Sequence, residues 1–528
     1  MTPYVAEDFT RTEQAILRRY FTDIGGPVFA VVNLPEVVKA ALFARYARSS
    51  KSMRRLFIDE FVNDLDVSGD ADEDATVGLQ GADEMYDKLF AEYGDEAVAG
   101  LGGVHLACEQ ASHVLTRWIE WGRGMSYLRQ SARYVAYDAR LGGRYRFHRD
   151  PSVLASSLGA RYVGDMDRMF DTYADLVPRL TDHFRERYPK GRDESDFVYR
   201  QSIRAEAFDT LRGLLPAASL ANVGIYGSGK GYESLIRRMY ALGLPEARTY
   251  AGLMLAELRK VIPSFLRGVD DPDRGLAWSA YVAETDQAMR QLTSAILPPA
   301  EAADDKSSVT LVDFDPDGEV KTVTAMLYPY CHEPEEQIED RVRLMSVEER
   351  IAIMRAYVGD RAERRHRPGR ALERTAYHFD VLGDYGAFRD LQRSTTVEWQ
   401  GLTPFHGYIR PDAVEEAGVG PAFDEAMERS AALYHDLSAD FPEQAAYAVS
   451  MAYRVRYSVQ MNAREAMHLL EYRSSSDAHP SDRLVAQQMH EQLSEVAGHR
   501  ALAAMMMFVD HSDERERVGA STGNALMR

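Results

Sequence analysis

The stretch MNAREAMHLLEYR, residues 461–473, follows a segment in which apolar and polar side chains alternate. Within that segment, residues 447–460, every second residue is Tyr, Val or Met. A period of two predicts a strand with one buried face and one polar face. The stretch itself carries Asn462, Arg464, His468 and Arg473 in a pattern typical of a short helix. A strand that leads into a basic helix is therefore the first structural element that the sequence predicts.

The start of this helix is defined by Asn462 and Glu465, whose types and spacing match a capping box. The N–H groups in the first turn of a helix favour a phosphate or another anion. The helix therefore predicts an anion site. A well-capped structural helix with a basic surface is the alternative interpretation of the same spacing.

The composition restricts the class of protein. A chain of 528 residues exceeds a typical single domain several-fold, so we expect two domains or more. Its 82 acidic and 62 basic side chains give a formal charge of -20, which disfavours binding to nucleic acid or to an anionic membrane. Its two cysteines, Cys108 and Cys331, exclude a disulfide framework and a cysteine-based zinc site. No long apolar stretch or signal-like N-terminus is found, so we expect a cytoplasmic protein without membrane spans.

A boundary between two domains is predicted at ILPPAEAADDKSS, residues 296–308, which has little to bury. We therefore divide the chain into residues 1–300 and 301–528. The segment after the boundary, residues 308–328, predicts a β-hairpin with its turn at Asp317 and Gly318. We expect the acidic stretch 66–78 to be a solvated loop. We expect the C-terminal residues 510–528 to be frayed or disordered. Helical periods occur in the first half in residues 12–22, 36–64, 105–135, 166–187 and 231–262.

A second phosphate-binding pattern lies in GIYGSGKG, residues 224–231, which contains the GxxxxGK part of a P-loop. Residues 309–315 could then supply a magnesium-binding Asp. Gly231, however, stands where a P-loop needs Ser or Thr to reach magnesium. A P-loop nucleoside triphosphatase is thus one alternative, and a Gly-rich turn that opens the following helix is the other.

In the first half, RGMSYLRQSARY, residues 123–134, places Arg123, Ser126, Gln130 and Arg133 on one face if the segment is helical. The segment resembles the signature RHRxxSxNExSxRY of the flavin-dependent thymidylate synthases, the ThyX family. The sequence departs from that signature at four positions, Trp121, Gly122, Leu128 and Arg129. The residues that match it are Arg123, Ser126, Ser131, Arg133 and Tyr134.

The helix at 461–473 resembles a second ThyX signature, an N-x-R tripeptide followed by Asn or His and then by a terminal Arg. The resemblance implies that Asn462, Arg464 and His468 contact FAD. It also implies that Arg473 contacts the uracil ring of dUMP and helps to ionise it. Arg464 and His468 share a helix face, whereas Arg473 projects toward the other side of the axis.

Each half also contains a weaker copy of the signature that the other half has. In the first half, LRGLLP at 211–216 resembles the R-x-x-L-P segment, which implies that Arg212 binds dUMP, and Ser228 and Lys230 stand in for the N-x-R tripeptide. In the second half, HRPGRALE at 366–373 resembles the H-x-S-P-x-E segment, which implies FAD binding by His366. There Arg393 takes the place of the first Arg of the RHRxxS signature. The literal RHR at 365–367 precedes it in the wrong order.

The resemblance implies an α/β (α+β) fold of two tandem ThyX-like units, each a small, mainly antiparallel sheet packed with long helices. It implies the reductive methylation of dUMP to dTMP with methylenetetrahydrofolate and NADPH through FAD. It further implies a homodimer that forms a pseudo-tetramer. Because each half keeps one signature, we expect Ser126, Ser131 and Arg133 to join the residues of the second-half helix in one composite site. A catalytically altered or inactive ThyX relative that binds nucleotide or flavin is the alternative.

Overall fold

The computed structural model describes residues 4–62, 102–122, 124–192, 194–297, 308–392, 396–476 and 478–512. The chain divides into two compact units, each built from separate segments. Unit 1 comprises Met1–Leu180, Thr210–Glu301 and Ala413–Ser450. Unit 2 comprises Thr181–Asp209, Ala302–Asp412 and Met451–Arg528. Each unit thus contains a segment from the other half of the sequence. The predicted domains, residues 1–300 and 301–528, stay a prediction.

Unit 1 contains a four-stranded antiparallel sheet in the order β1-β2-β4-β3. Its strands are β1 (Val28–Val31), β2 (Gly103–Ser112), β3 (Ser126–Arg129) and β4 (Leu220–Ser228). The pairing of β2 with β4 shifts register between Cys108 and Ala111, which marks a β-bulge. Helix α5 (His113–Ile119) follows β2, and α9 (Gly229–Ala241) follows β4.

Unit 2 repeats this plan with a second four-stranded antiparallel sheet, in the order β5-β6-β8-β7. Its strands are β5 (Val309–Phe314), β6 (Ala376–Asp384), β7 (Thr396–Trp399) and β8 (Arg454–Asn462). Helix α15 (Tyr385–Leu391) follows β6, and α18 (Ala463–Arg473) follows β8. The strand order and the helix that follows each central strand are the same in both sheets. The predicted fold of two small antiparallel sheets with packed helices is therefore confirmed.

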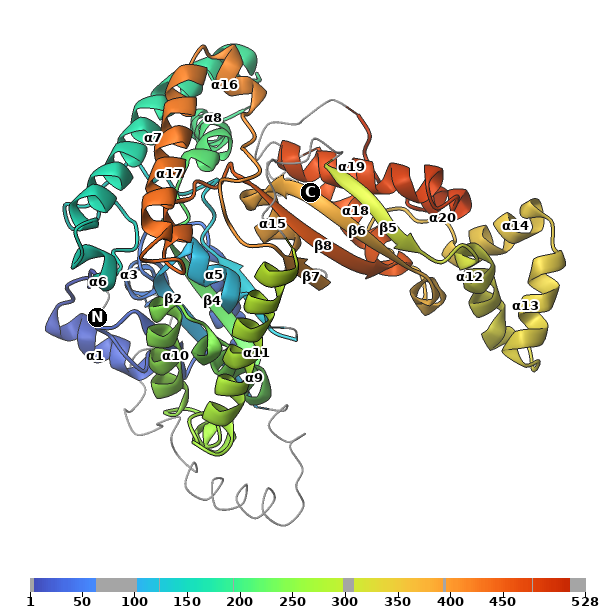
Figure 1. Ribbon diagram of the computed structural model, residues 1–528, viewed down its shortest axis with the longest axis horizontal. Helices are drawn as coiled ribbons and strands as arrows, with labels where there is room; N and C mark the ends of the chain where they lie inside the picture. Colours follow the sequence, from blue (N-terminus) through green and yellow to red (C-terminus); the bar gives the residue numbers. More distant parts are fainter. Residues whose placement is uncertain are drawn as a thin grey trace. The chain divides into compact units, whose positions relative to one another are not determined.

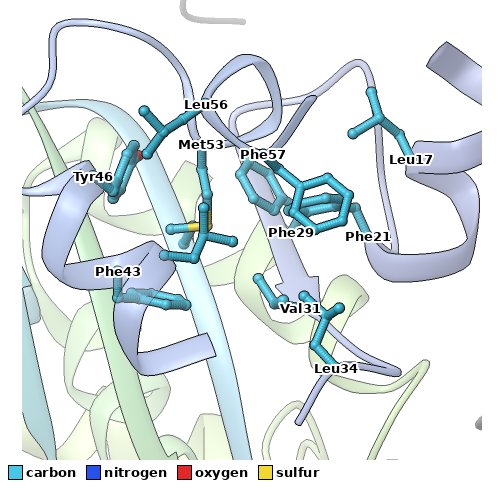
Figure 2. Close-up of a cluster of buried hydrophobic side chains, with 12 residues drawn as sticks. Leu17, Phe21, Phe29, Val31, Leu34, Phe43, Tyr46, Met53, Leu56 and Phe57 are labelled. Carbon is cyan, nitrogen blue, oxygen red and sulfur yellow. The ribbon is translucent and has the colours of Figure 1, made fainter. Parts of the chain in front are cut away.

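The core of unit 1 includes an aromatic cluster on β1 (Figure 2). Helices α1 (Arg11–Tyr20), α2 (Glu36–Tyr46) and α3 (Met53–Glu60) supply most of the side chains around the strand. The ring of Phe21 meets those of Phe29 and Phe57 edge-on, at centroid distances of 5.5 Å and 5.3 Å. Buried aromatic side chains contribute most to the hydrophobic stabilisation of such a core.

The long helix α7 (Gly159–Arg187), which belongs to unit 1 as far as Leu180, lies beside α17 (Gly420–Ser438), although the two are far apart in the sequence (Figure 1). Two ion pairs join them, one between Arg161 and Asp436 and one between Arg429 and Asp165. The turn after α17 is also fixed within unit 1, because the Tyr447 hydroxyl donates to Glu246 at 2.7 Å. The segment 413–450 is thus a structural part of unit 1.

The remaining elements are mostly helical. The first group, in chain order, is α6 (Pro151–Leu154), α8 (Asp196–Leu211), η3 (Arg212–Leu214), α10 (Pro245–Leu258), η4 (Pro263–Leu266), α11 (Gly275–Ile296), α12 (Gly318–Leu327) and η5 (Tyr328–Tyr330). The second group is α13 (Glu335–Leu344), α14 (Val347–Val358), η6 (Arg370–Arg374), α16 (Asp412–Glu416), η7 (Ala445–Ala448), α19 (Pro480–Glu495) and α20 (Arg500–Met505). In the described ranges, none of the helices has the length and apolar character needed to span a bilayer.

Two predicted elements were wrong. The hairpin at 308–328 is instead strand β5 followed by helix α12, because Val320, Val323 and Met326 recur at helical spacing and are buried. The strand expected from residue 447 begins only at Arg454, since η7 and a turn occupy its first part. The apolar side chains there are buried, as the alternation indicated, but the backbone is not extended throughout.

The predicted helix over residues 105–135 is also wrong, since β2, α5 and β3 occupy it. The other four helical predictions agree with the structure. Residues 12–22 correspond to α1, residues 36–64 to α2 and α3, residues 166–187 to α7, and residues 231–262 to α9 and α10. The acidic stretch 66–78 and most of the C-terminal segment lie outside the described residues.

Candidate functional site

The junction between β8 and α18 has the geometry that the sequence predicts for a capped helix. The Asn462 side chain accepts a hydrogen bond from the N–H of Glu465 at 2.9 Å. The Glu465 carboxylate in turn accepts from the N–H of Asn462 at 3.1 Å. This capping box fixes where α18 starts and hence which way Arg464 and His468 point.

A basic segment is anchored to α18 by a buried ion pair between Arg361 and Glu471. Two nitrogens of the Arg361 guanidinium donate to the two oxygens of the Glu471 carboxylate, each at 2.6 Å. Both side chains are buried, with exposed fractions of 2% and 0%. A buried bidentate pair holds its two elements in a defined geometry. The arginines that follow Arg361 are thereby held next to the helix.

Two of these neighbouring residues contact His468 and Tyr472 on the outer side of α18. The Arg367 guanidinium lies 2.9 Å from Nε2 of His468. The Arg364 guanidinium stands 4.7 Å from the centroid of the Tyr472 ring, which is stacked on His468. Burial, together with the positive charges of Arg367 and Arg364, lowers the pKa of His468. The neutral ring can accept a hydrogen bond from Arg367.

Arg464 joins the same cluster from the first turn of α18. Its Nε donates to the carbonyl of Pro368 at 3.0 Å, and its Nη1 donates to Glu373 at 2.9 Å. Glu373 is also paired with Arg370, which together with Arg464 lowers the pKa of the Glu373 carboxyl. We call the set Arg364, Arg367, Arg370, Arg464 and His468 the basic cluster. Two of its four arginines, Arg370 and Arg464, share the carboxylate of Glu373, so arginines outnumber that carboxylate and the cluster suits an anionic ligand.

Arg473 lies at the other end of α18 and does not take part in the basic cluster. One of its nitrogens donates to the carbonyl of Asp390, and another lies 3.5 Å from the carboxylate of Asp482. Its side chain is only 15% exposed. The contact with Asp390 sets Arg473 beside the segment that leads to residue 393. The predicted separation of Arg473 from Arg464 and His468 thus agrees with the structure.

Strand β4 and helix α9 are the unit 1 counterparts of β8 and α18. The Ser228 hydroxyl caps α9, accepting from the N–H of Gly231 at 3.2 Å, in the place that Asn462 takes in unit 2. Counted from these caps, Ser234 and Met239 occupy the positions of His468 and Arg473. The first-half copy therefore keeps the cap but lacks the imidazole and the terminal guanidinium.

The same strand excludes the P-loop interpretation. Gly224 and Gly227 lie within β4 and pair with Ala107 and Val104 of β2. A P-loop instead needs a flexible loop that wraps its N–H groups around a phosphate between strand and helix. The glycines here serve close packing: a Cβ on Gly224 would lie 2.0 Å from a ring carbon of Phe43. The alternative of a Gly-rich turn is also wrong, because the helix starts directly after the strand.

The first-half candidates lie on β3 and in the turn that follows it. Ser126 begins β3 and is exposed, while Ser131, Arg133 and Tyr134 share the next turn, where the N–H of Arg133 donates to the Ser131 hydroxyl at 3.3 Å. Because β3 is extended, the one-face helix inferred for Ser126 and Arg133 is wrong. Gln130 is buried, and its amide donates to the carbonyl of Ser49 at 2.6 Å, so its role is structural.

The other candidates fall in three places. Arg212 begins η3 in unit 1 and is partly buried. His366 lies in the basic segment of unit 2 with an exposed ring, whose Nδ1 accepts weakly from the N–H of Ala362 at 3.4 Å. Arg123 and Arg393 lie outside the described residues. The binding roles of all these candidates stay predictions.

Sequence reasoning missed the residues that hold the site together. Arg361 and Glu471 anchor the basic segment, Arg367 contacts His468, and Asp482 faces Arg473. The only signal was the basic run at 361–370, in which His366 was assigned to FAD but the literal RHR at 365–367 was set aside because it does not fit the order of the ThyX signature. No group of three or more metal-ligating side chains occurs among the residues that the structure describes.

Comparison with known proteins gave matches in both halves of the chain. The family model described as thymidylate synthase complementing protein matches residues 37–264 and 310–498. A UPF0159 protein of Chlamydia pneumoniae is 35% identical over 516 residues, which cover 96% of both chains. A UPF0159 protein of Thermoplasma acidophilum is 30% identical over 504 residues, covering 90% of this chain and 96% of the relative.

Among solved structures, the chain resembles the crystal structure of a UMP/dUMP methylase, PolB from Streptomyces cacaoi, bound with 5-Br dUMP. The sequence identity is 20%, and the match covers 38% of this chain and 96% of PolB with a TM-score of 0.31. A TM-score this low does not establish a shared fold for the whole chain.

Proposed function

Because the chain belongs to the thymidylate synthase complementing protein (ThyX) family and carries two fused ThyX-like units, we propose that it methylates dUMP to dTMP with the help of FAD. The observation that carries the proposal is the arrangement on α18. One end of this helix contributes to a basic cluster, and the other end presents a largely buried arginine that faces Asp482. A basic cluster at one end of the helix and a single arginine at the other suit two anionic ligands.

The basic cluster fits the anionic part of a flavin cofactor. Arg464 and His468, with Arg367 and Arg364 beside them, offer several N–H donors to a pyrophosphate, and Arg370 adds charge. Asn462 keeps the first turn of α18 in place, and His366 and Arg393 would add contacts from the same half. When bound, reduced FAD would supply the hydride that completes the methyl group, with NADPH as reductant and methylenetetrahydrofolate as carbon donor.

Arg473 is the proposed catalytic residue. Its guanidinium would stabilise the negative charge on an ionised uracil ring, and Asp482 would orient it for that contact. Ser126, Ser131, Arg133, Tyr134, Arg212 and Arg123 are the proposed substrate-binding residues from the first half. That they act in one site with Arg473 stays a prediction, and unchanged nucleotide binding in both Arg133→Ala and Arg473→Ala would contradict it.

The experiment is to purify the full chain, record its flavin spectrum and measure dTMP formation from dUMP, methylenetetrahydrofolate and NADPH. We expect a yellow protein that forms dTMP, and we expect Arg473→Ala to lower dTMP formation by about 10²- to 10³-fold while the flavin spectrum is retained. Arg355→Ala on α14, an exposed arginine of the same unit, is the matched control. Flavin binding without dTMP formation would instead favour the altered or inactive relative, for which the loss of His and Arg equivalents at Ser234 and Met239 is the supporting observation.

A further inference from the structure

Unit 1 contains a cavity of about 660 Å³ outside the residues discussed so far. Its volume lies within the range of small-molecule binding pockets. The N-terminal segment at Tyr4 and Val5 forms one side, and the hairpin 141–149 forms the opposite side. Helix α10 contributes Thr249 and Leu253. All the lining residues belong to unit 1.

The side of the cavity formed by the N-terminal segment is built by a buried network. The Tyr4 hydroxyl donates to Glu109 at 2.7 Å. Glu109 also forms an ion pair with Arg54, and each of these two side chains is only 2% exposed. Gln110 exchanges two hydrogen bonds with the backbone of Val5, at 3.2 Å and 3.1 Å. Gln110 adopts a left-handed backbone conformation, with φ of 56°, at the bulge in β2. A strained non-glycine residue that fixes a pocket wall is a feature that occurs at ligand sites.

Three arginines stand on the opposite hairpin. Gly142 and Gly143 both have positive φ and allow the tight turn at its tip. Arg144 is exposed, while Arg146 stacks on Tyr137 with its guanidinium 4.6 Å from the ring centroid. Arg149 lies 3.8 Å over the ring of Phe147, and burial lowers the pKa of its guanidinium. Such aromatic stacking holds the guanidinium groups in place.

Most of the charged side chains that line the cavity are arginines. Asp23 is the acidic residue among the lining side chains, and its carboxylate accepts from the N–H groups of Gly25 and Gly26 at 2.7 Å and 3.1 Å. The rings of Tyr145, Phe147 and Tyr250 and the side chain of Leu253 supply apolar surface. The cavity therefore combines a cationic side with an apolar body.

Over the residues that the structure describes, unit 2 differs from unit 1 in some of the parts that build this cavity. Phe147 and Tyr408 occupy equivalent positions. Phe147 forms a β-bridge with Ser219, directly before β4, and Tyr408 forms one with Tyr453, directly before β8. The connection from Ser112 to Phe147 is longer than the one from Asp384 to Tyr408, and it contains most of the arginine-bearing hairpin. The pairing of β6 with β8 also runs without a bulge. The bulge in β2 and the arginine-bearing hairpin, which distinguish unit 1, thus both lie at this cavity.

We propose that this cavity binds a small organic anion with a flat apolar body, of the aromatic carboxylate or sulfonate class. The arginines hold the anionic group at the hairpin, and the body lies against the aromatic and aliphatic side chains. The proposal does not rest on the proposed dUMP methylation, so either can fail without the other.

The probe is 8-anilinonaphthalene-1-sulfonate, titrated into the full chain by calorimetry and fluorescence, with neutral N-phenyl-1-naphthylamine as the uncharged comparison. We expect one saturable sulfonate site per chain. Arg144→Gln and Arg149→Gln should each weaken it about tenfold, the effect of losing one charge-assisted hydrogen bond. The exposed Arg179→Gln on α7 should leave it unchanged.

Thr249→Trp, which adds bulk from α10, should abolish binding of both probes. Arg144 is exposed, so its variant is expected to fold even if Arg149→Gln does not. Equal sulfonate affinity in Arg144→Gln, Arg179→Gln and the parent protein would overturn the proposal. Binding that does not saturate, or that survives Thr249→Trp, would overturn it as well.

Discussion

Units 1 and 2 share a strand order and a capped helix after the last central strand, yet they differ in what those elements carry. In unit 2, α18 bears Arg464, His468 and Arg473, and a basic segment is anchored to it. In unit 1, α9 has Ser234 and Met239 at the last two of these positions. Unit 1 instead has an arginine-bearing hairpin and a bulge beside a cavity. A capped strand–helix junction is thus present in both units while the side chains that it carries differ.

Arg473→Ala should produce the largest effect on function. Removing a preorganised cation from a developing oxyanion costs about 10²- to 10³-fold in turnover. We therefore expect kcat/KM for dTMP formation to fall by about that factor and dUMP binding to weaken in calorimetry. Arg238→Ala, next to the equivalent position in unit 1, should change neither quantity. Comparable losses in both variants would remove the functional distinction between α18 and α9.

Glu471→Gln should produce the largest effect on stability. It leaves the buried Arg361 charge without its carboxylate, which costs about 3 to 5 kcal/mol in the free energy of unfolding. Urea unfolding followed by circular dichroism measures the change. The exposed pair of Arg370 with Glu373 offers a matched control, and Glu373→Gln should shift the midpoint far less. Equal shifts would mean that the anchor of the basic segment is not the buried pair.

Arg464→Ala should weaken flavin binding while leaving the fold intact. The loss of one charged donor from the basic cluster corresponds to roughly 1.5 to 3 kcal/mol, or about a tenfold to hundredfold increase in Kd. Flavin fluorescence quenching gives the value directly. Lys230→Ala at the equivalent position of α9 should leave the Kd unchanged. If Lys230→Ala raised the Kd for flavin and Arg464→Ala did not, the flavin site would have to be assigned to unit 1 instead of unit 2.

The two helix caps should give the smallest and the most similar effects. Asn462→Ala and Ser228→Ala each remove a side-chain acceptor from the first helical turn, at about 1 kcal/mol in stability. Thermal or urea unfolding measures both. Only Asn462→Ala should also weaken flavin binding, because only α18 carries the basic cluster. A flavin effect from Ser228→Ala would contradict the assignment of the cap in unit 1 to structure alone.

Part of the fold and of the site followed from local patterns. Asn462 and Glu465 predicted the start of α18 because capping depends on residues three apart. The face shared by Arg464 and His468, opposite Arg473, followed from helix geometry in the same way. The helix predicted over 105–135 failed because strand pairing with β4, which is distant in sequence, overrides local periodicity there.

The sequence by itself determined the family, the two ThyX-like units and the capped start of α18, since these depend on short motifs and on their order along the chain. Only the tertiary structure decided that Arg361 and Glu471 bring the basic segment to α18, that residues 413–450 belong to unit 1, and that Tyr4, Gln110 and the hairpin 141–149 enclose a cavity. These features join residues that are far apart in the chain. Their contacts form only when burial and pairing bring distant segments together, so no local pattern records them.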